Sequence, residues 1–235
     1  MANPTFVENK IYHIYNRGVE KRKIFMDDKD YFRFIHDLFE FNDQNNVPNI
    51  NYYFDTKTMS VESRHLKKQK AEKRSRKLLV EILAFTLMPN HFHLLLRQRV
   101  EGGISKFAQK LGAGYAKYFN TRYERVGSLF QGKFKAVSID EDAHFLHILH
   151  YIHSNPLSLS SYRPPRSIAR EMKFLEDYRW SSYMDYIGKE NFPSVTQREF
   201  LLDFYGGPEK YKKETKEWIK DWSKNTEKVK EVSFD

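Results

Sequence analysis

Apolar and polar residues alternate along the chain in a way that predicts four strands. Residues 11–16 are β-branched and aromatic, which is typical of a strand. Two further apolar runs, 79–88 and 91–98, are separated by a Pro-Asn turn signal and predict a hairpin. A fourth strand is predicted over 130–138.

Helical spacing of the apolar residues predicts three helices between and after these strands. Asp27 can cap the first helix, which follows the first strand. The second is predicted over 104–119, and the third extends from Asp140 to Ser154 and ends near Pro156. The order of elements predicts an α+β fold: a ferredoxin-like antiparallel sheet with helices on one face.

The periodic pattern also predicts how the chain is divided. We expect a core over residues 5–156, interrupted over about 42–80 by a polar and basic insertion with a short strand near 51–54. The remainder, 157–235, begins with a linker-like segment and predicts a small, mostly helical C-terminal extension.

The distribution of charge indicates a polyanionic partner. The chain holds 40 Lys and Arg against 31 Asp and Glu, a formal net charge of +9. Residues 64–77 carry eight Lys or Arg and one Glu, and residues 101–139 carry seven Lys or Arg and two acids. Two basic regions on a mildly acidic body are typical of a surface for phosphates. The alternative for 64–77 is a solvated loop, while residues 208–235, with eight Lys and seven acids, read as an exposed helix with ion pairs.

The composition excludes several classes of protein. The absence of cysteine excludes a disulfide framework, thiolate metal sites and a cysteine nucleophile. The longest apolar run, 78–88, is interrupted by Glu81 and is shorter than the about 18 residues that a membrane span needs. The first residues lack a secretory signal pattern. We therefore expect a soluble, cytoplasmic protein.

The start of the strand over 91–98 carries candidate metal ligands. In His91-Phe92-His93, the two-residue period of a strand places both imidazoles on one face and Phe92 on the other. Two neutral imidazoles on a rigid strand form half of a divalent-metal site. Short H-x-H triplets also arise by chance, so this motif needs support from elsewhere in the chain.

The third predicted helix supplies that support. Tyr151 and Asn155 are four residues apart and project from one face of a helix. The amide oxygen of Asn155 can complete a metal shell begun by two imidazoles, and the phenol of Tyr151 can attack a phosphate beside it. The alternative is that Tyr151 is a half-buried packing residue. Not all of the helix's histidines can be ligands, since they wind around it: His144, His147, His150 and His153.

These motifs, taken in order, resemble the HUH endonuclease superfamily, specifically the single-tyrosine transposases of bacterial insertion sequences and their REP-associated relatives. The resemblance covers most of residues 5–188. It is carried by YHIYNRGVEKRKIF (12–25), FTLMPNHFHLLL (85–96), YFNTRYERVGSLFQGKFKAV (118–137), LHYIHSNPL (149–157) and RWSSYMDYIG (179–188).

The resemblance implies roles for individual residues. His91 and His93 fall at the metal-binding pair, Tyr151 at the nucleophilic tyrosine, and Asn155 at the polar third ligand. It further implies Mg²⁺ or Mn²⁺, cleavage of single-stranded DNA, often beside an imperfect hairpin, and a 5′-phosphotyrosine intermediate. The sequence is compatible with either a monomer or a homodimer. The long insertion over 42–80 departs from the family pattern.

Other residues are candidates for the same chemistry or for DNA contact. Tyr115 and Tyr118 compete with Tyr151, but both fit the apolar stripe of the second predicted helix and neither precedes an Asn-Pro helix end. Five basic residues near strand ends are candidate phosphate contacts, or otherwise ordinary solvated charges: Arg17, Lys21, Arg22, Lys133 and Lys135.

Two other functions remain open at the level of sequence. The same architecture with basic charge suits a non-catalytic RNA-recognition-type module, although residues 132–136 (GKFKA) only faintly match the aromatic pattern that such a module needs. A metal-dependent phosphohydrolase is the third possibility, and it would release products without a covalent adduct.

Overall fold

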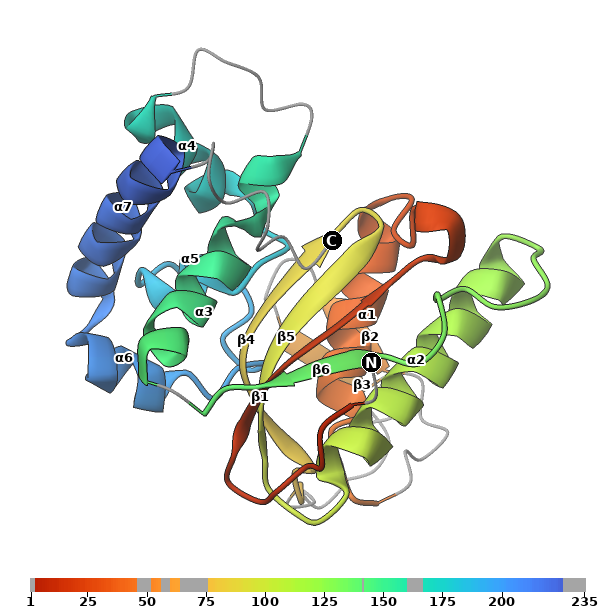
Figure 1. Cartoon of the computed structure of the whole chain (residues 1–235). Helices are drawn as coiled ribbons and strands as arrows, with labels where there is room; N and C mark the ends of the chain where they lie inside the picture. Colours follow the sequence, from red (N-terminus) through yellow and green to blue (C-terminus); the bar gives the residue numbers. More distant parts are fainter. Residues whose placement is uncertain are drawn as a thin grey trace.

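A four-stranded antiparallel sheet lies at the centre of the protein, in the order β4-β5-β1-β6 (Figure 1). The strands are β1 (Ile11–Arg17), β4 (Val80–Met88), β5 (His91–Gln98) and β6 (Lys135–Ser138). This computed structural model describes residues 3–45, 52–55, 60–63, 76–140, 142–159 and 167–225, without the side chains of 52–55, 60–63, 142–146 and 223–225. The strand order is that of a ferredoxin-like sheet, so the predicted fold class is confirmed.

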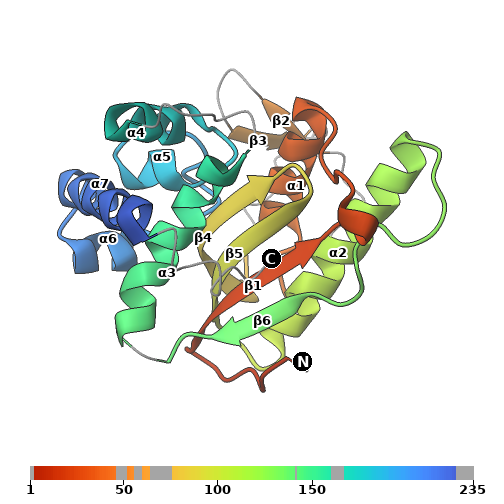
Figure 2. The same cartoon turned by 45° about the horizontal axis from the view of Figure 1, so that its top comes forward.

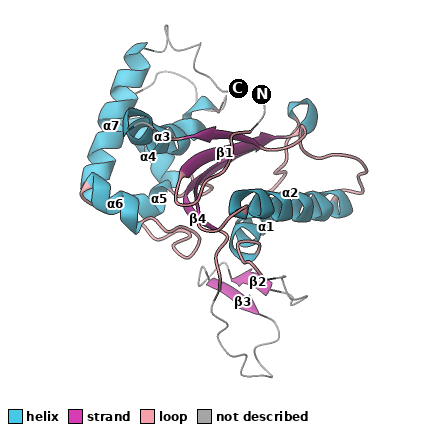
Figure 3. Cartoon of the chain, turned by 60° about the horizontal axis from the view of Figure 1, so that its bottom comes forward, coloured by secondary structure: helices cyan, strands magenta, loops and turns pink. Residues whose placement is uncertain are grey.

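One face of the sheet is covered by α1 (Asp28–Glu40) and α2 (Gly103–Arg122), as Figure 3 shows. The predicted cap of α1 is present, because the Asp27 side chain accepts hydrogen bonds from the backbone N–H groups of Lys29 and Asp30. At Gly114 of α2 a Cβ atom would collide with the Phe41 ring, so glycine allows the chain to pack closely here. This face holds the larger hydrophobic cluster, to which β1 and β5 contribute Tyr12, Ile14, Phe92, Leu94 and Leu96.

The opposite face is covered as well, which the sequence did not predict. There α3 (Asp142–Ser154) and the 3-10 turn η2 (Asn155–Ser158) pack with the C-terminal helices against β4 and β5 (Figure 2). The second hydrophobic cluster joins Leu83 and Leu95 of the sheet to Ile152 of α3 and to Tyr186 and Tyr211 of the extension. The C-terminal helices are α4 (Ile168–Asp177), α5 (Tyr183–Tyr186), α6 (Glu199–Tyr205) and α7 (Pro208–Asn225).

The extension also covers the outer edge of β4. Thr86 forms a β-bridge with Ser181, and the backbone N–H of Leu87 donates to the carbonyl of Trp180 (2.8 Å). The Ser182 hydroxyl accepts from the N–H of Phe85 (3.0 Å). The Trp-Ser-Ser-Tyr segment thus satisfies backbone groups that an exposed edge strand would offer to another chain.

The insertion between α1 and β4 contains a small hairpin. Strand β2 (Tyr52–Asp55) coincides with the strand predicted near 51–54, and it pairs with β3 (Ser60–Ser63). The basic run predicted at 64–77 lies outside the described residues except for its last two positions. Of these, Arg76 contacts α1: its guanidinium lies 3.7 Å from the centre of the Phe39 ring and donates to the carbonyls of Phe39 and Asn42.

In the described parts of the chain, none of the helices combines the length and the apolar character that crossing a bilayer requires.

Candidate active site

The predicted histidine pair lies at the start of β5. Phe92 points into the cluster beneath α1 and α2, so His91 and His93 occupy the opposite face, as the strand period predicts. Their ring centres are 5.0 Å apart with the ring planes nearly perpendicular. His93 is almost completely buried and His91 is 8% exposed.

The helix α3 brings the two other predicted residues to this pair. Asn155 follows the last turn of α3, and its Oδ1 atom is 3.3 Å from Nε2 of His91. The Tyr151 ring is partly buried and stands edge-on to His93, with the ring centres 5.7 Å apart. The four residues therefore converge within a single chain.

A third imidazole, which the sequence analysis missed, belongs to the same cluster. Nε2 of His13 in β1 is 2.8 Å from Nδ1 of His93, and the two rings stack at 5.0 Å. The Tyr151 ring is 6.0 Å from that of His13. The available signal was the strand alternation in Ile-Tyr-His-Ile-Tyr, which places His13 opposite the core-facing Tyr12 and Ile14.

Burial keeps the imidazoles of His13 and His93 uncharged. It lowers the pKa of His13 to about 3, and it lowers the pKa of His93 well below the usual value. The proximity of His13, His91 and Arg17 lowers the pKa of His93 further. Neutral imidazoles have the lone pairs that a cation needs.

The polar atoms around His91 fit a bound cation. Nδ1 of His91 is 2.6 Å from the amide oxygen of Asn90, which can only accept a hydrogen bond. A neutral His91 that donates to Asn90 has no proton left on Nε2, so two lone pairs face each other at the 3.3 Å contact with Asn155. Neighbouring oxygen or nitrogen ligands at about 2.1 Å from an octahedral ion lie about 3 Å apart.

The second imidazole is consistent with the same arrangement. Nε2 of His93 is buried and has no hydrogen-bond partner among the described residues. The residues described contain no group of three or more His, Cys, Asp or Glu side chains that could hold a metal ion. The candidate ligand set is therefore two imidazoles and one amide oxygen.

The predicted basic residues differ in their distance from this cluster. Arg17 pairs with His91 across β1 and β5, and the exposed Lys135 on β6 lies 5.8 Å from the centre of the Tyr15 ring. The carbonyl of the exposed Lys21 accepts from the Asn90 side chain.

The two remaining basic residues lie at the surface of the neighbouring loops. Arg22 forms an ion pair with Glu20 (3.2 Å), and Lys133 is exposed in the loop before β6. The structure thus brings Arg17 directly to the histidine cluster and places the other four around the ends of β1 and β6.

The competing tyrosines lie on the other face of the sheet. The Tyr115 hydroxyl is buried and donates to the carbonyl of Ile24 (2.6 Å). The Tyr118 hydroxyl donates to Asp30 (3.0 Å), and burial raises its pKa to about 12. Both hydroxyls have structural partners far from the histidines.

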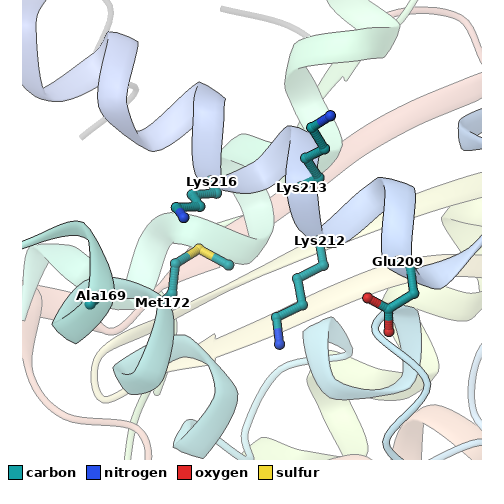
Figure 4. A pocket seen from close by; sticks show the side chains of 6 residues that line it. All are labelled: Ala169, Met172, Glu209, Lys212, Lys213 and Lys216. Carbon is teal, nitrogen blue, oxygen red and sulfur yellow. The ribbon is translucent and has the colours of Figure 1, made fainter.

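A cavity of about 330 Å³ lies elsewhere, between α4 and α7 (Figure 4). None of its lining residues belongs to the histidine cluster: Ala169, Met172, Glu209, Lys212, Lys213 and Lys216.

The sequence profile of the IS200-like transposases matches residues 52–155, a segment that contains His91, His93, Tyr151 and Asn155. This match confirms the resemblance to the tyrosine transposases that the motifs indicated.

A solved structure supports the fold. The chain is similar to a REP-associated tyrosine transposase bound to a REP hairpin, at 12% sequence identity and a TM-score of 0.50. The similarity covers 83% of this chain and 89% of that one. No curated protein matches the chain significantly.

Proposed function

We propose that this transposase is a metal-dependent single-stranded DNA endonuclease and strand transferase that uses Tyr151 as its nucleophile. The observation that supports it most is the convergence of Tyr151 and Asn155 on His91 and His93 within one chain. Because one chain supplies all four side chains, we propose that a monomer can cleave DNA in the cytoplasm, whether or not the protein also dimerises.

His91, His93 and Asn155 would hold the cation, Mg²⁺ or Mn²⁺. When bound, the ion would neutralise charge on the scissile phosphate and polarise its oxygens. The protein itself keeps His93 neutral by burial and holds the Asn155 amide at the end of α3, so that little rearrangement is needed on loading.

Tyr151 would carry out the transfer step. Its phenolic oxygen forms a bond to phosphorus while the bond from phosphorus to the 3′ oxygen breaks. The phenol proton passes to solvent, and the departing oxygen takes up a proton to become a free 3′-hydroxyl. The phosphotyrosine conserves the energy of the diester, so a DNA 3′-hydroxyl can reverse the step at another site without ATP.

The substrate we propose is single-stranded DNA that carries a hairpin. The related solved structure holds a REP hairpin, and Arg17 and Lys135 lie on the same face of the sheet as the histidines. Lys21, Arg22 and Lys133 would contact phosphates farther from the scissile bond. The partly exposed Tyr15 beside Lys135 offers a ring on which a base can stack.

The decisive experiment traps the covalent intermediate. Labelled single-stranded hairpin DNA is incubated with Mn²⁺ and the protein, and adducts are resolved on a denaturing gel. We expect the wild type to form an adduct, Tyr151→Phe to bind DNA without forming one, and Tyr118→Phe to behave as the wild type. His91→Ala should abolish cleavage while the protein stays folded.

The alternatives give different outcomes in the same assay. Cleavage without any adduct would identify a phosphohydrolase. Binding without cleavage by the wild type would identify a non-catalytic module. An adduct formed normally by Tyr151→Phe would place the nucleophile at another residue.

A further inference from the structure

Each of the two candidate ligand histidines has its Nδ1 atom engaged by another side chain. Nδ1 of His91 meets the amide oxygen of Asn90 at 2.6 Å, and Nδ1 of His93 meets Nε2 of His13 at 2.8 Å. The first contact comes from the adjacent residue. The second joins two different strands and is completely buried.

The contact between His13 and His93 permits two arrangements of the shared proton. If His13 donates, the proton of neutral His93 sits on Nε2, which is buried and has no acceptor among the described residues. If His93 donates from Nδ1, its Nε2 carries a lone pair instead. Only the second arrangement leaves His93 able to bind a cation through Nε2.

His13 is well placed to hold this arrangement. It lies on a central strand of the sheet, paired with Leu95 on one side and with Val137 on the other. Its ring is nearly parallel to that of His93, at an interplanar angle of 18°, and it is 1% exposed. A packed ring on a central strand has few other rotamers, so its Nε2 is a fixed acceptor.

We propose that His13 is a positioning residue that fixes the tautomer and the ring orientation of His93 and so presents Nε2 of His93 to the cation. This inference rests on the proposed function, because it needs a cation at His93. Groups that accept the second ring proton of a metal-binding histidine typically contribute 10- to 100-fold to metal affinity.

The test compares two substitutions at His13 that differ in hydrogen bonding. Glutamine places an amide oxygen about as far from Cβ as Nε2 of histidine and can accept from Nδ1 of His93, whereas leucine fills space without accepting. Mn²⁺ affinity is measured by electron paramagnetic resonance on the full chain without DNA. His36→Ala, which alters a buried histidine of α1 on the other face of the sheet, is the control, and His91→Ala is the reference for loss of the site.

We expect His13→Leu to weaken Mn²⁺ binding about 10- to 100-fold, and His13→Gln and His36→Ala to bind as the wild type. The role of His13 would be overturned if His13→Leu kept the wild-type affinity, or if His13→Leu and His13→Gln lost affinity equally. The proposed metal site is tested separately by His91→Ala. Undiminished binding by His91→Ala would overturn the proposed metal site itself.

A second measurement keeps the inference testable if His13→Leu does not fold. Nitrogen-15 NMR of the metal-free wild type reports which ring nitrogen of His93 carries the proton. A proton on Nδ1 supports the inference, and a proton on Nε2 contradicts it.

Discussion

At the scale of single residues, the side chain of Asp30 joins the two helices on the face of the sheet opposite the histidines. It is fully buried near the start of α1 and accepts from the backbone N–H of Met26 and from the hydroxyls of Tyr118 and Tyr123. Arg122 at the end of α2 completes the set with an ion pair of 2.6 Å. This carboxylate ties the two helices together, because it accepts hydrogen bonds from the start of α1 and from Tyr118 and Arg122 of α2.

Asp30→Ala should therefore lower the free energy of unfolding by about 3 kcal/mol, since it removes the acceptor of the Met26 N–H and of the Tyr118 and Tyr123 hydroxyls. Urea unfolding followed by circular dichroism measures the change. Asp27→Ala is the matched control: this half-exposed carboxylate also binds Arg122, and its removal costs about 1 kcal/mol as a lost helix cap. Equal effects of the two substitutions would show that the network around Asp30 is not cooperative.

At the scale of elements, α7 anchors the helix that carries Tyr151. His153 of α3 contacts the Tyr211 hydroxyl of α7 through Nδ1 (2.7 Å) and the Ser182 hydroxyl through Nε2 (2.8 Å). His150 stacks on the Tyr211 ring at 5.0 Å, with the planes almost parallel. The position of Tyr151 at the histidine cluster thus depends on a helix some sixty residues farther along the chain.

We expect Tyr211→Phe to lower the free energy of unfolding by about 1–3 kcal/mol, because Nδ1 of the buried His153 loses its partner. The Tyr211→Phe variant should also form the covalent adduct with DNA more slowly, because α3 would be held less firmly. Tyr183→Phe provides the control in the same cluster, because the buried Tyr183 hydroxyl makes no hydrogen bond of normal geometry in the described part of the chain. A loss of stability from Tyr183→Phe equal to that from Tyr211→Phe would contradict this account.

At the scale of the whole molecule, burial of neutral histidines makes stability depend on pH. Burial lowers the pKa of His150 to about 4 and that of His153 well below its usual value, as it does for His13 and His93. In the unfolded chain a histidine binds a proton near pH 6.5. Below that pH the unfolded state holds more protons than the folded state, so stability rises with pH and is lost on acidification.

The free energy of unfolding should thus fall between pH 7 and pH 5, by up to about 2 kcal/mol for each such histidine. His150→Gln should reduce that fall by about this amount, as measured by urea unfolding at the two pH values. His147→Gln, which changes an exposed histidine of the same helix, should leave the fall nearly unchanged, because His147 is only the secondary cause of the shift at His150. A wild type equally stable at both pH values would contradict the argument.

Much of the fold could be predicted from local periodicity. The strand pattern located β4 and β5 to within a residue and placed His91 and His93 on one face, because successive side chains of a strand alternate. Helical spacing likewise grouped Tyr151 with Asn155. These patterns depend only on residues close together in the chain. The division into a core over 5–156 and an extension stays a prediction, although the two share a hydrophobic cluster.

The sequence by itself determined the order of strands and helices, the pair of imidazoles and the spacing of the tyrosine and the amide. Only the tertiary structure decided that Tyr151 rather than Tyr115 or Tyr118 meets the histidines, and that His13, 80 positions from His93, contacts it. It also decided that the C-terminal helices cover the second face of the sheet. These contacts arise from strand pairing and from helices packed across the sheet, which join residues whose separation no local period encodes.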